Sequence, residues 1–310
     1  MFVTEADGFL GTELIKVLVT RGHEVCGLAR SPDAAEQVRR AGATAVIGDL
    51  MTPGPWQDEA QAEWVFHLST YPFDGGRMTA QRADFLMHRQ IQMDAHLLDA
   101  VAAAATRRIV YVSDASYYGA TGPRPITEDA PPRPSAWGRC LAPALDRVEG
   151  YTLAGLPIVT AFPGWIYGNA SWFRRRVIEP VMSGRRVLHF GSTGPWVSPI
   201  HVEDCARGLV HLAERGEVGG RYFIVNSDPI RLHDFAATFA RLADRTLRRR
   251  GRSTMVAVRV RGRPWVAVLG DLVEGIVVAN RLQGSNADRA RTALWSAVEQ
   301  QVELPKLRVA

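Results

Sequence analysis

Lysine is almost absent from this chain of 310 residues, in which Lys16 and Lys306 stand against 35 arginines (37 basic residues − 2). With 32 acidic residues, the formal net charge is +5. The basic residues are spread along the sequence, whereas a nucleic-acid-binding surface needs them gathered in one patch or stripe. Even the densest run, residues 245–252, is typical of a solvated helix end and loop. We therefore expect no nucleic-acid partner.

Cysteine is scarce as well, and its three positions lie far apart, at Cys26, Cys140 and Cys205. An odd number of cysteines without metal-type spacing argues against a disulfide framework and against a metal site. Such a chain suits a reducing compartment, so we expect a cytoplasmic protein without a bound metal.

Long hydrophobic runs are also missing. The most apolar late stretch, residues 265–279, is interrupted by Asp271 and Glu274 and is too short to span a bilayer. A first strand that begins at Phe2 leaves no room for a signal peptide. We expect neither a membrane partner nor a secretory signal.

What the sequence does contain is an alternation of short apolar runs with stretches of helical periodicity. Ser31-Pro32-Asp33 marks one helix start, because a serine cap followed by proline is typical of a first turn. Strands are expected at Phe2–Thr4, Glu24–Ala29, Thr44–Ile47, Trp64–Leu68, Arg108–Ser113 and Pro157–Phe162, and helices at Gly8–Arg21, Ala80–Ala105 and Leu141–Leu153. The alternation predicts an α/β fold with a doubly wound, Rossmann-like parallel sheet. Ligands of such sheets bind at the carboxyl ends of the strands.

The regularity weakens in the second half of the chain. We expect a dinucleotide-binding-type domain over residues 1–165 and a small C-terminal substrate lobe over residues 166–310. A helix at Val202–Arg215 and a strand at Arg221–Val225 indicate that residues 198–226, approximately, return to the sheet. Leu232–Ala243 has the pattern of a further helix.

Several segments, taken in order, resemble the extended short-chain dehydrogenase/reductases, the NAD-dependent epimerase/dehydratase group. They are VTEADGFLG at 3–11, VFHLST at 65–70, IVYVSDASYYG at 109–119, PSAWGRCLAPALDRVE at 134–149 and SPIHVEDCARGLVHL at 198–212. The resemblance covers nearly the whole chain and implies the same Rossmann-like fold. It also implies a homodimer that pairs through the helices at 80–105 and 141–153.

The cofactor loop departs from the pattern of this family, which is Gly-x-x-Gly-x-x-Gly. Gly8 and Gly11 are present, but Glu5 stands at the first glycine and Asp7 adds a second carboxylate. A helix N-terminus attracts anions, so two carboxylates there would occupy the diphosphate position and repel a dinucleotide. One such repulsion at about 4 Å costs on the order of 4 kcal/mol at an effective dielectric constant near 20. We therefore expect no cofactor.

If a dinucleotide binds nevertheless, the resemblance implies which residues hold it. Gly8 and Gly11 would face the diphosphate, and Asp49-Leu50 would face the adenine. Arg30 stands where a basic residue meets a 2′-phosphate, which would favour NADP.

The catalytic positions have changed too. Asp114 stands at the position of the serine of this family, Trp137 at the tyrosine and Leu141 at the lysine, and neither lysine of the chain lies near enough to replace it. An indole N–H cannot transfer a proton near neutral pH. The usual redox chemistry therefore lacks its proton carrier. We expect catalysis to rest instead on Asp114, with Ser113, Tyr117 and Trp137 around it.

A carboxylate in a partly apolar cleft has a raised pKa and can act as a general acid or base. The alternative is that Asp114 caps the turn that follows it. Aromatic residues at positions that the resemblance places near the substrate suit a flat or polycyclic ligand. They are Tyr71, Trp165, Tyr167 and Trp196. The alternative for these rings is an ordinary place in the core.

Three functions remain open. The first is a non-redox acid–base enzyme that catalyses a dehydration, cyclisation or isomerisation of an aromatic or polycyclic small molecule in specialised metabolism. The second is a non-catalytic ligand-binding or regulatory protein on the same scaffold. The third is an NADP-dependent reductase or epimerase with unusual catalytic residues.

Overall fold

The computed structural model describes residues 1–72, 79–119, 125–134, 137–168, 171, 173–174, 179, 187–190, 196–226, 229–238 and 255–258. The chain forms two compact units. The described part of unit 1 lies within Met1–Pro163 and Val202–Ile224, and that of unit 2 within Gly164–His201 and residues 225–258. The sequence had suggested a division at residue 165, with a return at about 198–226.

Unit 1 contains a seven-stranded sheet in which every strand pairing is parallel. The spatial order is β11-β6-β5-β4-β1-β2-β3. The strands are β1 (Phe2–Val3), β2 (Cys26–Ala29), β3 (Thr44–Ile47), β4 (Trp64–His67), β5 (Arg108–Val112), β6 (Ile158–Pro163) and β11 (Arg221–Ile224). The predicted doubly wound, Rossmann-like fold is confirmed. The strand order reverses between β1 and β4, which is the switch point where such sheets bind ligands.

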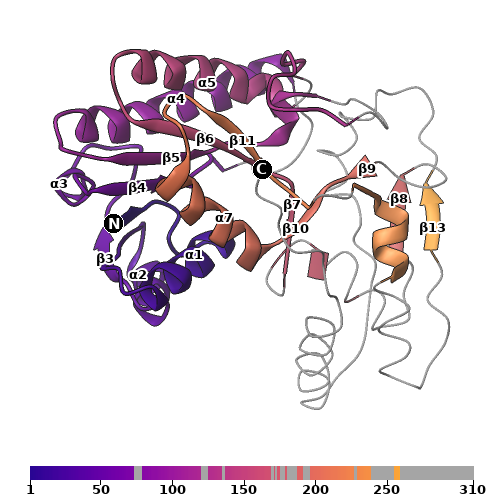
Figure 1. The fold of residues 1–310 in the computed structure, drawn as a ribbon, viewed down its shortest axis with the longest axis horizontal. Helices are drawn as coiled ribbons and strands as arrows, with labels where there is room; N and C mark the ends of the chain where they lie inside the picture. Colours follow the sequence, from indigo (N-terminus) through magenta and orange to yellow (C-terminus); the bar gives the residue numbers. More distant parts are fainter. Residues whose placement is uncertain are drawn as a thin grey trace. The chain divides into compact units, whose positions relative to one another are not determined.

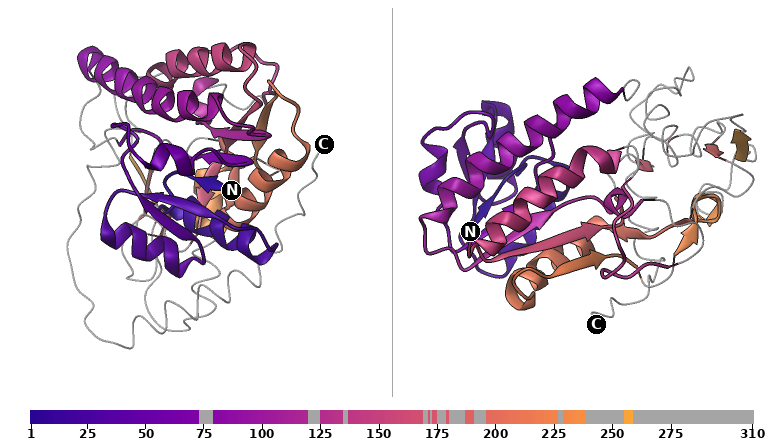
Figure 2. Two further views of the ribbon diagram at one scale, coloured as in Figure 1. Left: turned by 90° about the vertical axis from the view of Figure 1, so that its left-hand side faces the viewer. Right: turned by 90° about the horizontal axis from the view of Figure 1, so that it is seen from above.

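Helices cover both faces of this sheet (Figure 1, Figure 2). On one face, α4 and α5 pack against each other, and on the other face α1 packs against α7 and α2. The helices are α1 (Phe9–Thr20), α2 (Pro32–Arg40), α3 (Trp56–Glu59), α4 (Ala80–Ala102), η1 (Ala115–Tyr117, a 3₁₀ helix), α5 (Trp137–Leu153) and α7 (Val202–Arg215). The Ser31 hydroxyl accepts the Ala34 amide and caps α2, and the Thr79 hydroxyl caps α4 in the same way.

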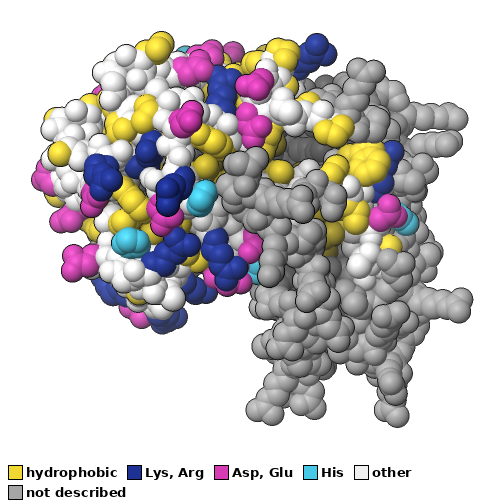
Figure 3. Space-filling model, viewed as in Figure 1, with side chains coloured by type: hydrophobic (Ala, Val, Ile, Leu, Met, Phe, Trp, Pro, Cys, Tyr) yellow, Lys and Arg dark blue, Asp and Glu magenta, His cyan; other side chains and the backbone are white. Residues whose placement is uncertain are grey.

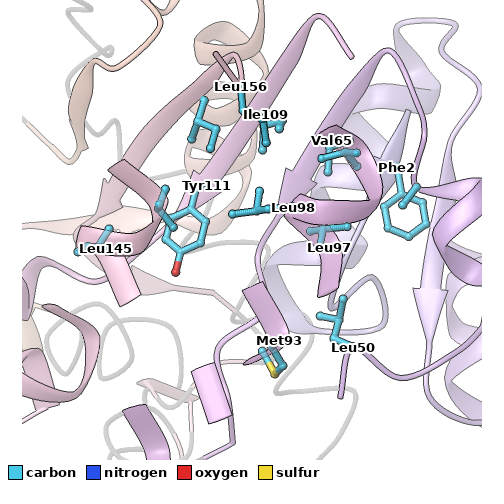
Figure 4. Close-up of a cluster of buried hydrophobic side chains, with 14 of the residues drawn as sticks. Phe2, Leu50, Val65, Met93, Leu97, Leu98, Ile109, Tyr111, Leu145 and Leu156 are labelled. Atoms are coloured by element: carbon cyan, nitrogen blue, oxygen red, sulfur yellow. The ribbon is translucent and has the colours of Figure 1, made fainter. Parts of the chain in front are cut away.

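One core cluster of unit 1 lies between the sheet and the pair α4 and α5 (Figure 4). Phe2, Val65 and Ile109 from neighbouring strands belong to one cluster with Leu97 and Leu98 of α4, and all five are fully buried. Burying one such side chain contributes about 1.5–3 kcal/mol. This cluster holds β1, β4 and β5 together in register.

Unit 2 contains three short strand pairs and a cluster of rings. The pairs are β7 (Trp165–Tyr167) with β10 (Pro199–His201), β9 (Trp196–Val197) with β12 (Ile230–Arg231), and β8 (Val187–Phe190) with β13 (Met255–Val258). Residues 232–238, the described part of the helix expected at Leu232–Ala243, are helical. The rings of Tyr167, Phe173, His201 and Phe235 lie within about 6 Å of one another as neighbouring pairs.

Charges of both signs are interspersed over the described part of the face shown in Figure 3. Several charged side chains of the described residues form ion pairs, among them Arg21 with Glu214 and Arg40 with Glu36. Exposed pairs of this kind contribute little to stability. Within the described residues, no helix combines the length and apolarity needed to cross a membrane.

Helix α5 meets η1 at a glycine. A Cβ atom on Gly138 would lie 2.1 Å from the carbonyl oxygen of Ser116, so only glycine permits this contact. Gly150, near the other end of the same helix, has nothing within 4 Å of the corresponding position. The contact at Gly138 places Trp137 beside the segment that follows β5. The helix thus begins earlier than the predicted Leu141.

We predict opposite effects on stability for the same substitution at these two glycines. Gly138→Ala should lower the free energy of unfolding by about 1–3 kcal/mol, because the methyl group overlaps the backbone of Ser116. Gly150→Ala should raise it by about 0.5–1 kcal/mol, since alanine favours the helix and meets no neighbour. Urea unfolding followed by circular dichroism measures both changes. Equal effects of the two substitutions would contradict the close contact between α5 and η1.

Candidate active site

In the loop between β1 and α1, a glutamate adopts a backbone conformation that is typical of glycine. Glu5 has a φ angle of +50°, and it is the only non-glycine residue with positive φ in the described chain. This region costs an ordinary L-residue roughly 1–2 kcal/mol. The Glu5 carbonyl accepts the Gly8 amide at 2.9 Å, and a Cβ on Gly11 would lie 2.1 Å from that same carbonyl oxygen. Helix α1 therefore runs directly against the loop.

The Glu5 side chain lies over the N-terminus of α1. A Cβ on Gly8 would come within 3.0 Å of Glu5 Oε1, and Gly8, the N-cap residue, has no side chain to cap the helix. The backbone amide of Thr70, just beyond β4, donates a hydrogen bond to the Glu5 carboxylate. An anionic group of the protein itself thus occupies the place where a helix N-terminus attracts phosphate.

The pKa of Glu5 is raised above its usual range. Water still reaches this side chain, but the surrounding protein removes much of its hydration, and this is the largest cause of the shift. The charge of Asp7 raises the pKa further, whereas the Thr70 amide and the charge of Arg30 oppose the shift. Glu5 consequently holds a proton at a higher pH than an exposed glutamate does.

The other residues expected at a cofactor follow β2 and β3. Arg30 directly follows β2 and is exposed. Asp49 is exposed after β3, and its Oδ1 accepts the Met51 amide at 2.8 Å. Leu50 is buried in the core cluster, and its carbonyl accepts a hydrogen bond from His96 Nδ1 at 2.7 Å. These residues, with Gly8, all lie at the carboxyl edge of the sheet.

The predicted catalytic residues gather at the carboxyl end of β5. Asp114 is exposed, and its Oδ1 accepts the Ser116 amide at 2.7 Å, so it caps η1. Ser113 continues the strand pairing, since its amide donates to the Ala161 carbonyl. Trp137 is the first residue of α5 and lies beside this segment in the chain path, through the Gly138 contact.

Tyr117 points into the core. Its ring stacks on Phe162 with centroids 5.8 Å apart, and the Arg221 guanidinium lies 5.5 Å from its centre. Burial raises its pKa, so the phenol stays protonated at neutral pH. Leu141, at the position of the family lysine, is also buried.

The aromatic residues expected around a substrate are divided between the two units. Tyr71 belongs to unit 1, is half-buried, and meets Phe85 edge-on with ring centres 6.0 Å apart. In unit 2, Tyr167 is buried within the ring cluster and Trp165 is half-buried. Trp196 is 39% exposed, with the Arg231 guanidinium 4.5 Å from its ring centre.

A buried polar network, which the sequence did not reveal, lies beneath the site. Asp94 of α4 is 2% exposed and accepts hydrogen bonds from His67 Nε2 at 2.9 Å, Gln90 Nε2 at 2.7 Å and the Tyr111 hydroxyl at 2.8 Å. His67 Nδ1 lies 2.9 Å from the Thr4 hydroxyl. Burial, and secondarily Asp94, raises the pKa of Tyr111, so this phenol remains a donor. A buried carboxylate with three donors is well compensated.

The bonds of Thr4 define the tautomer of His67. Thr4 Oγ1 already accepts the amides of Leu68 at 3.0 Å and Ser69 at 3.2 Å, which uses both of its lone pairs. The Thr4 hydroxyl therefore donates its own hydrogen to His67 Nδ1. We accordingly assign the ring hydrogen of His67 to Nε2, which faces Asp94. The network links the ends of β1 and β4 to helix α4.

Gln90 extends the network to the loop after β4. Its Oε1 accepts the Tyr71 amide at 2.7 Å, and its Nε2 also donates to the Ser69 carbonyl at 3.3 Å. Thr70, whose amide binds Glu5, lies between these two residues. A sequence signal for this network exists: Gln90 and Asp94 are polar residues, four apart, on the apolar stripe of a helix.

Comparisons with known proteins identify the family of this chain. Residues 1–226 match the model of the NAD dependent epimerase/dehydratase family. The chain belongs to this family. Its scaffold is thus that of the extended short-chain epimerases, dehydratases and reductases.

Two curated relatives and one solved structure illustrate the similarity. A 4-hydroxy-2-methyl-3-oxo-4-farnesyl-3,4-dihydroquinoline-1-oxide ketoreductase from Stigmatella aurantiaca is 28% identical over 76% of this chain and 70% of its own length. A 3-diazoavenalumate denitrifying reductase from a Streptomyces species is 28% identical over 95% of this chain and 94% of its own. The structure of UDP-glucuronic acid 4-epimerase from Bacillus cereus, in complex with UDP-glucuronic acid and NAD, has a TM-score of 0.70 and 17% identity, covering 96% of this chain and 98% of that one.

The expectation of no cofactor, with NADP as the only alternative, is wrong. The family is described as NAD dependent, and the similar solved structure holds NAD. The sequence argument failed because it treated the negative charge of the carboxylates as permanent. Instead, Glu5 adopts the left-handed conformation and has a raised pKa.

The residues present fit a dinucleotide in all but one respect. Gly11 lets α1 pack closely against the loop, and Gly8 contributes no side-chain cap to compete for the first-turn amides of the helix. The exception is the Glu5 carboxylate over that turn. For metals, no group of three or more His, Cys, Asp or Glu side chains that could hold an ion is present among the residues that the structure describes.

We predict that removing the Asp94 carboxylate destabilises unit 1. Asp94→Leu should lower the free energy of unfolding by about 3–5 kcal/mol, because His67, Gln90 and Tyr111 keep buried donors without their acceptor. Asp94→Asn, which keeps one acceptor oxygen, should lose less. Urea unfolding measures both.

Asp84→Asn is the matched control for these variants, since Asp84 lies exposed on the same helix. It should change the free energy of unfolding by no more than about 0.5 kcal/mol. Wild-type stability of Asp94→Leu would show that the buried carboxylate does not hold β1, β4 and α4 together.

Proposed function

We propose that this protein is an NAD-dependent enzyme that acts on an aromatic small molecule of specialised metabolism, with Asp114 as its proton carrier. The observation that carries the proposal is the place of Asp114. It is exposed at the carboxyl end of β5, held by the Ser116 amide, while the family positions for tyrosine and lysine are Trp137 and Leu141.

The cofactor would be held by the edge of the sheet around the switch point. The first-turn amides of α1, which have no side-chain cap, suit its diphosphate. Arg30 and Asp49 flank this position from the ends of β2 and β3. When bound, such a cofactor supplies or accepts a hydride at a substrate carbon.

Asp114 can move the accompanying proton. The hydrogen bond from Ser116 engages Oδ1 and orients the carboxyl group, so Oδ2 is the atom that would exchange a proton with a substrate oxygen. The hydroxyl of the neighbouring Ser113 would donate a hydrogen bond to that substrate oxygen and so orient it. Tyr117, buried and protonated, would support this segment from the core rather than carry the proton.

The names of the two curated relatives support an aromatic substrate and a reductive reaction. One is named for a farnesylated dihydroquinoline oxide and the other for a diazo compound that it reduces.

A non-redox dehydration, cyclisation or isomerisation is the second candidate. One observation favours it: Leu141 is buried at the position of the lysine that holds the nicotinamide ribose in this family. It would use the same carboxylate with no net change in NAD. A non-catalytic ligand-binding protein, the third candidate, would show no turnover. Homodimerisation and a cytoplasmic location remain predictions of the sequence.

We predict that Asp114→Asn abolishes most turnover and leaves NAD binding intact. Loss of a general acid or base costs about 10²–10⁴ in rate, while the asparagine oxygen can still cap η1. The assay follows the absorbance of NADH with a panel of aryl ketones and quinones, and product analysis by mass spectrometry detects conversion without NADH consumption.

Asp129→Asn, an exposed change in another loop of unit 1, is the control and should keep full turnover. Unchanged turnover of Asp114→Asn would refute the role of Asp114. Conversion with no net consumption of NADH would favour the non-redox candidate.

A further inference from the structure

The cofactor loop carries an anion where the cofactor would place one. We propose that the Glu5 carboxylate is a built-in plug of the NAD site, which must be neutralised or displaced before the diphosphate can bind. The inference rests on the proposed NAD binding and adds a control of affinity to it.

Two neighbours define the position of the carboxylate. Its Oε1 approaches the open face of Gly8, and the Thr70 amide donates to it from the β4 side. The left-handed backbone at Glu5 keeps the loop in the glycine-like path while the side chain remains over α1. A carboxylate of the protein itself therefore lies beside the N-terminus of α1, where it makes no capping hydrogen bond.

Of the charged groups around Glu5, one raises its pKa and another lowers it. Asp7, on the same loop, disfavours its ionised form, whereas Arg30 after β2 favours it. His67 of β4 is fully buried, with its Nε2 hydrogen directed at Asp94 and its Nδ1 accepting from Thr4. Loss of hydration outweighs the favourable charges and raises the pKa of Glu5. A protonated Glu5 would also gain an O–H that can donate to a phosphate oxygen.

The sign of the pH dependence follows from this arrangement. Above its raised pKa, Glu5 is ionised, and the fraction of protein competent to bind falls as the pH rises. If only the neutral form binds, the dissociation constant for NAD⁺ rises by about tenfold per pH unit in that range. The NAD⁺ diphosphate keeps its charge between pH 5 and 8, so the ligand adds no titration of its own.

The test is calorimetric titration with NAD⁺ at pH 5.5, 6.5 and 7.5. We expect the wild type to bind progressively more weakly as the pH rises. Glu5→Gln and Glu5→Gly should bind at least about tenfold more tightly at pH 7.5 and show little pH dependence. Glu13→Gln, which removes the same charge farther along α1, is the matched control and should behave as the wild type. The NAD⁺-induced shift in the thermal unfolding temperature gives a second readout.

Each other outcome has a defined meaning. Equal affinities and pH profiles for the wild type and both Glu5 variants would overturn the plug and leave the proposed NAD binding intact. Tight binding by Glu5→Gly with wild-type behaviour of Glu5→Gln would overturn the role of charge, because side-chain volume would then block the site. Absence of binding by every variant at every pH would overturn the proposed function itself, provided that circular dichroism shows them folded.

Discussion

The buried carboxylate of Asp94 is the constraint on which the site depends. A charge placed between a helix and a parallel sheet is tolerable only when its oxygens are saturated, and here His67, Gln90 and Tyr111 saturate them. Each donor belongs to a different part of the fold or to the helix itself, so the carboxylate couples β4, β5 and α4. Through His67 and Thr4 the same network reaches the end of β1. The Asp94 network thus fixes the position of the sheet edge at which ligands bind in folds of this kind.

Much of the fold could be predicted because it follows from local rules. Ser31-Pro32 marked the start of α2, and the structure shows the serine cap on Ala34. Alternating apolar runs marked the strands to within a residue or two. The start of α5 was placed too late, at Leu141. Its true start, at Trp137, depends on the contact of Gly138 with η1, which lies far away in the sequence.

The site was less predictable than the fold, for two physical reasons. The partners of Asp94 come from β4 and β5, so no local pattern connects them, although a polar pair on the apolar stripe of α4 was visible. The prediction that no cofactor binds failed for another reason, because the charge of Glu5 was inferred from its residue type alone. Whether Glu5 is charged depends on its hydration and on the charges of Asp7 and Arg30, and these depend on the folded structure.

The departures from the family pattern share one electrostatic direction. Leucine for lysine at 141 removes a positive charge, and glutamate at 5 and aspartate at 114 each introduce a group that can carry a negative one. All three positions belong to unit 1, at or near the carboxyl edge of its sheet. A rim that has become more negative weakens the binding of anions and favours neutral or cationic ligands. It also stabilises the protonated form of any carboxyl group within it, so the same change that opposes a diphosphate makes Glu5 easier to neutralise. The same arrangement of charge therefore weakens the binding of the cofactor and favours the protonation of Glu5 that would restore it.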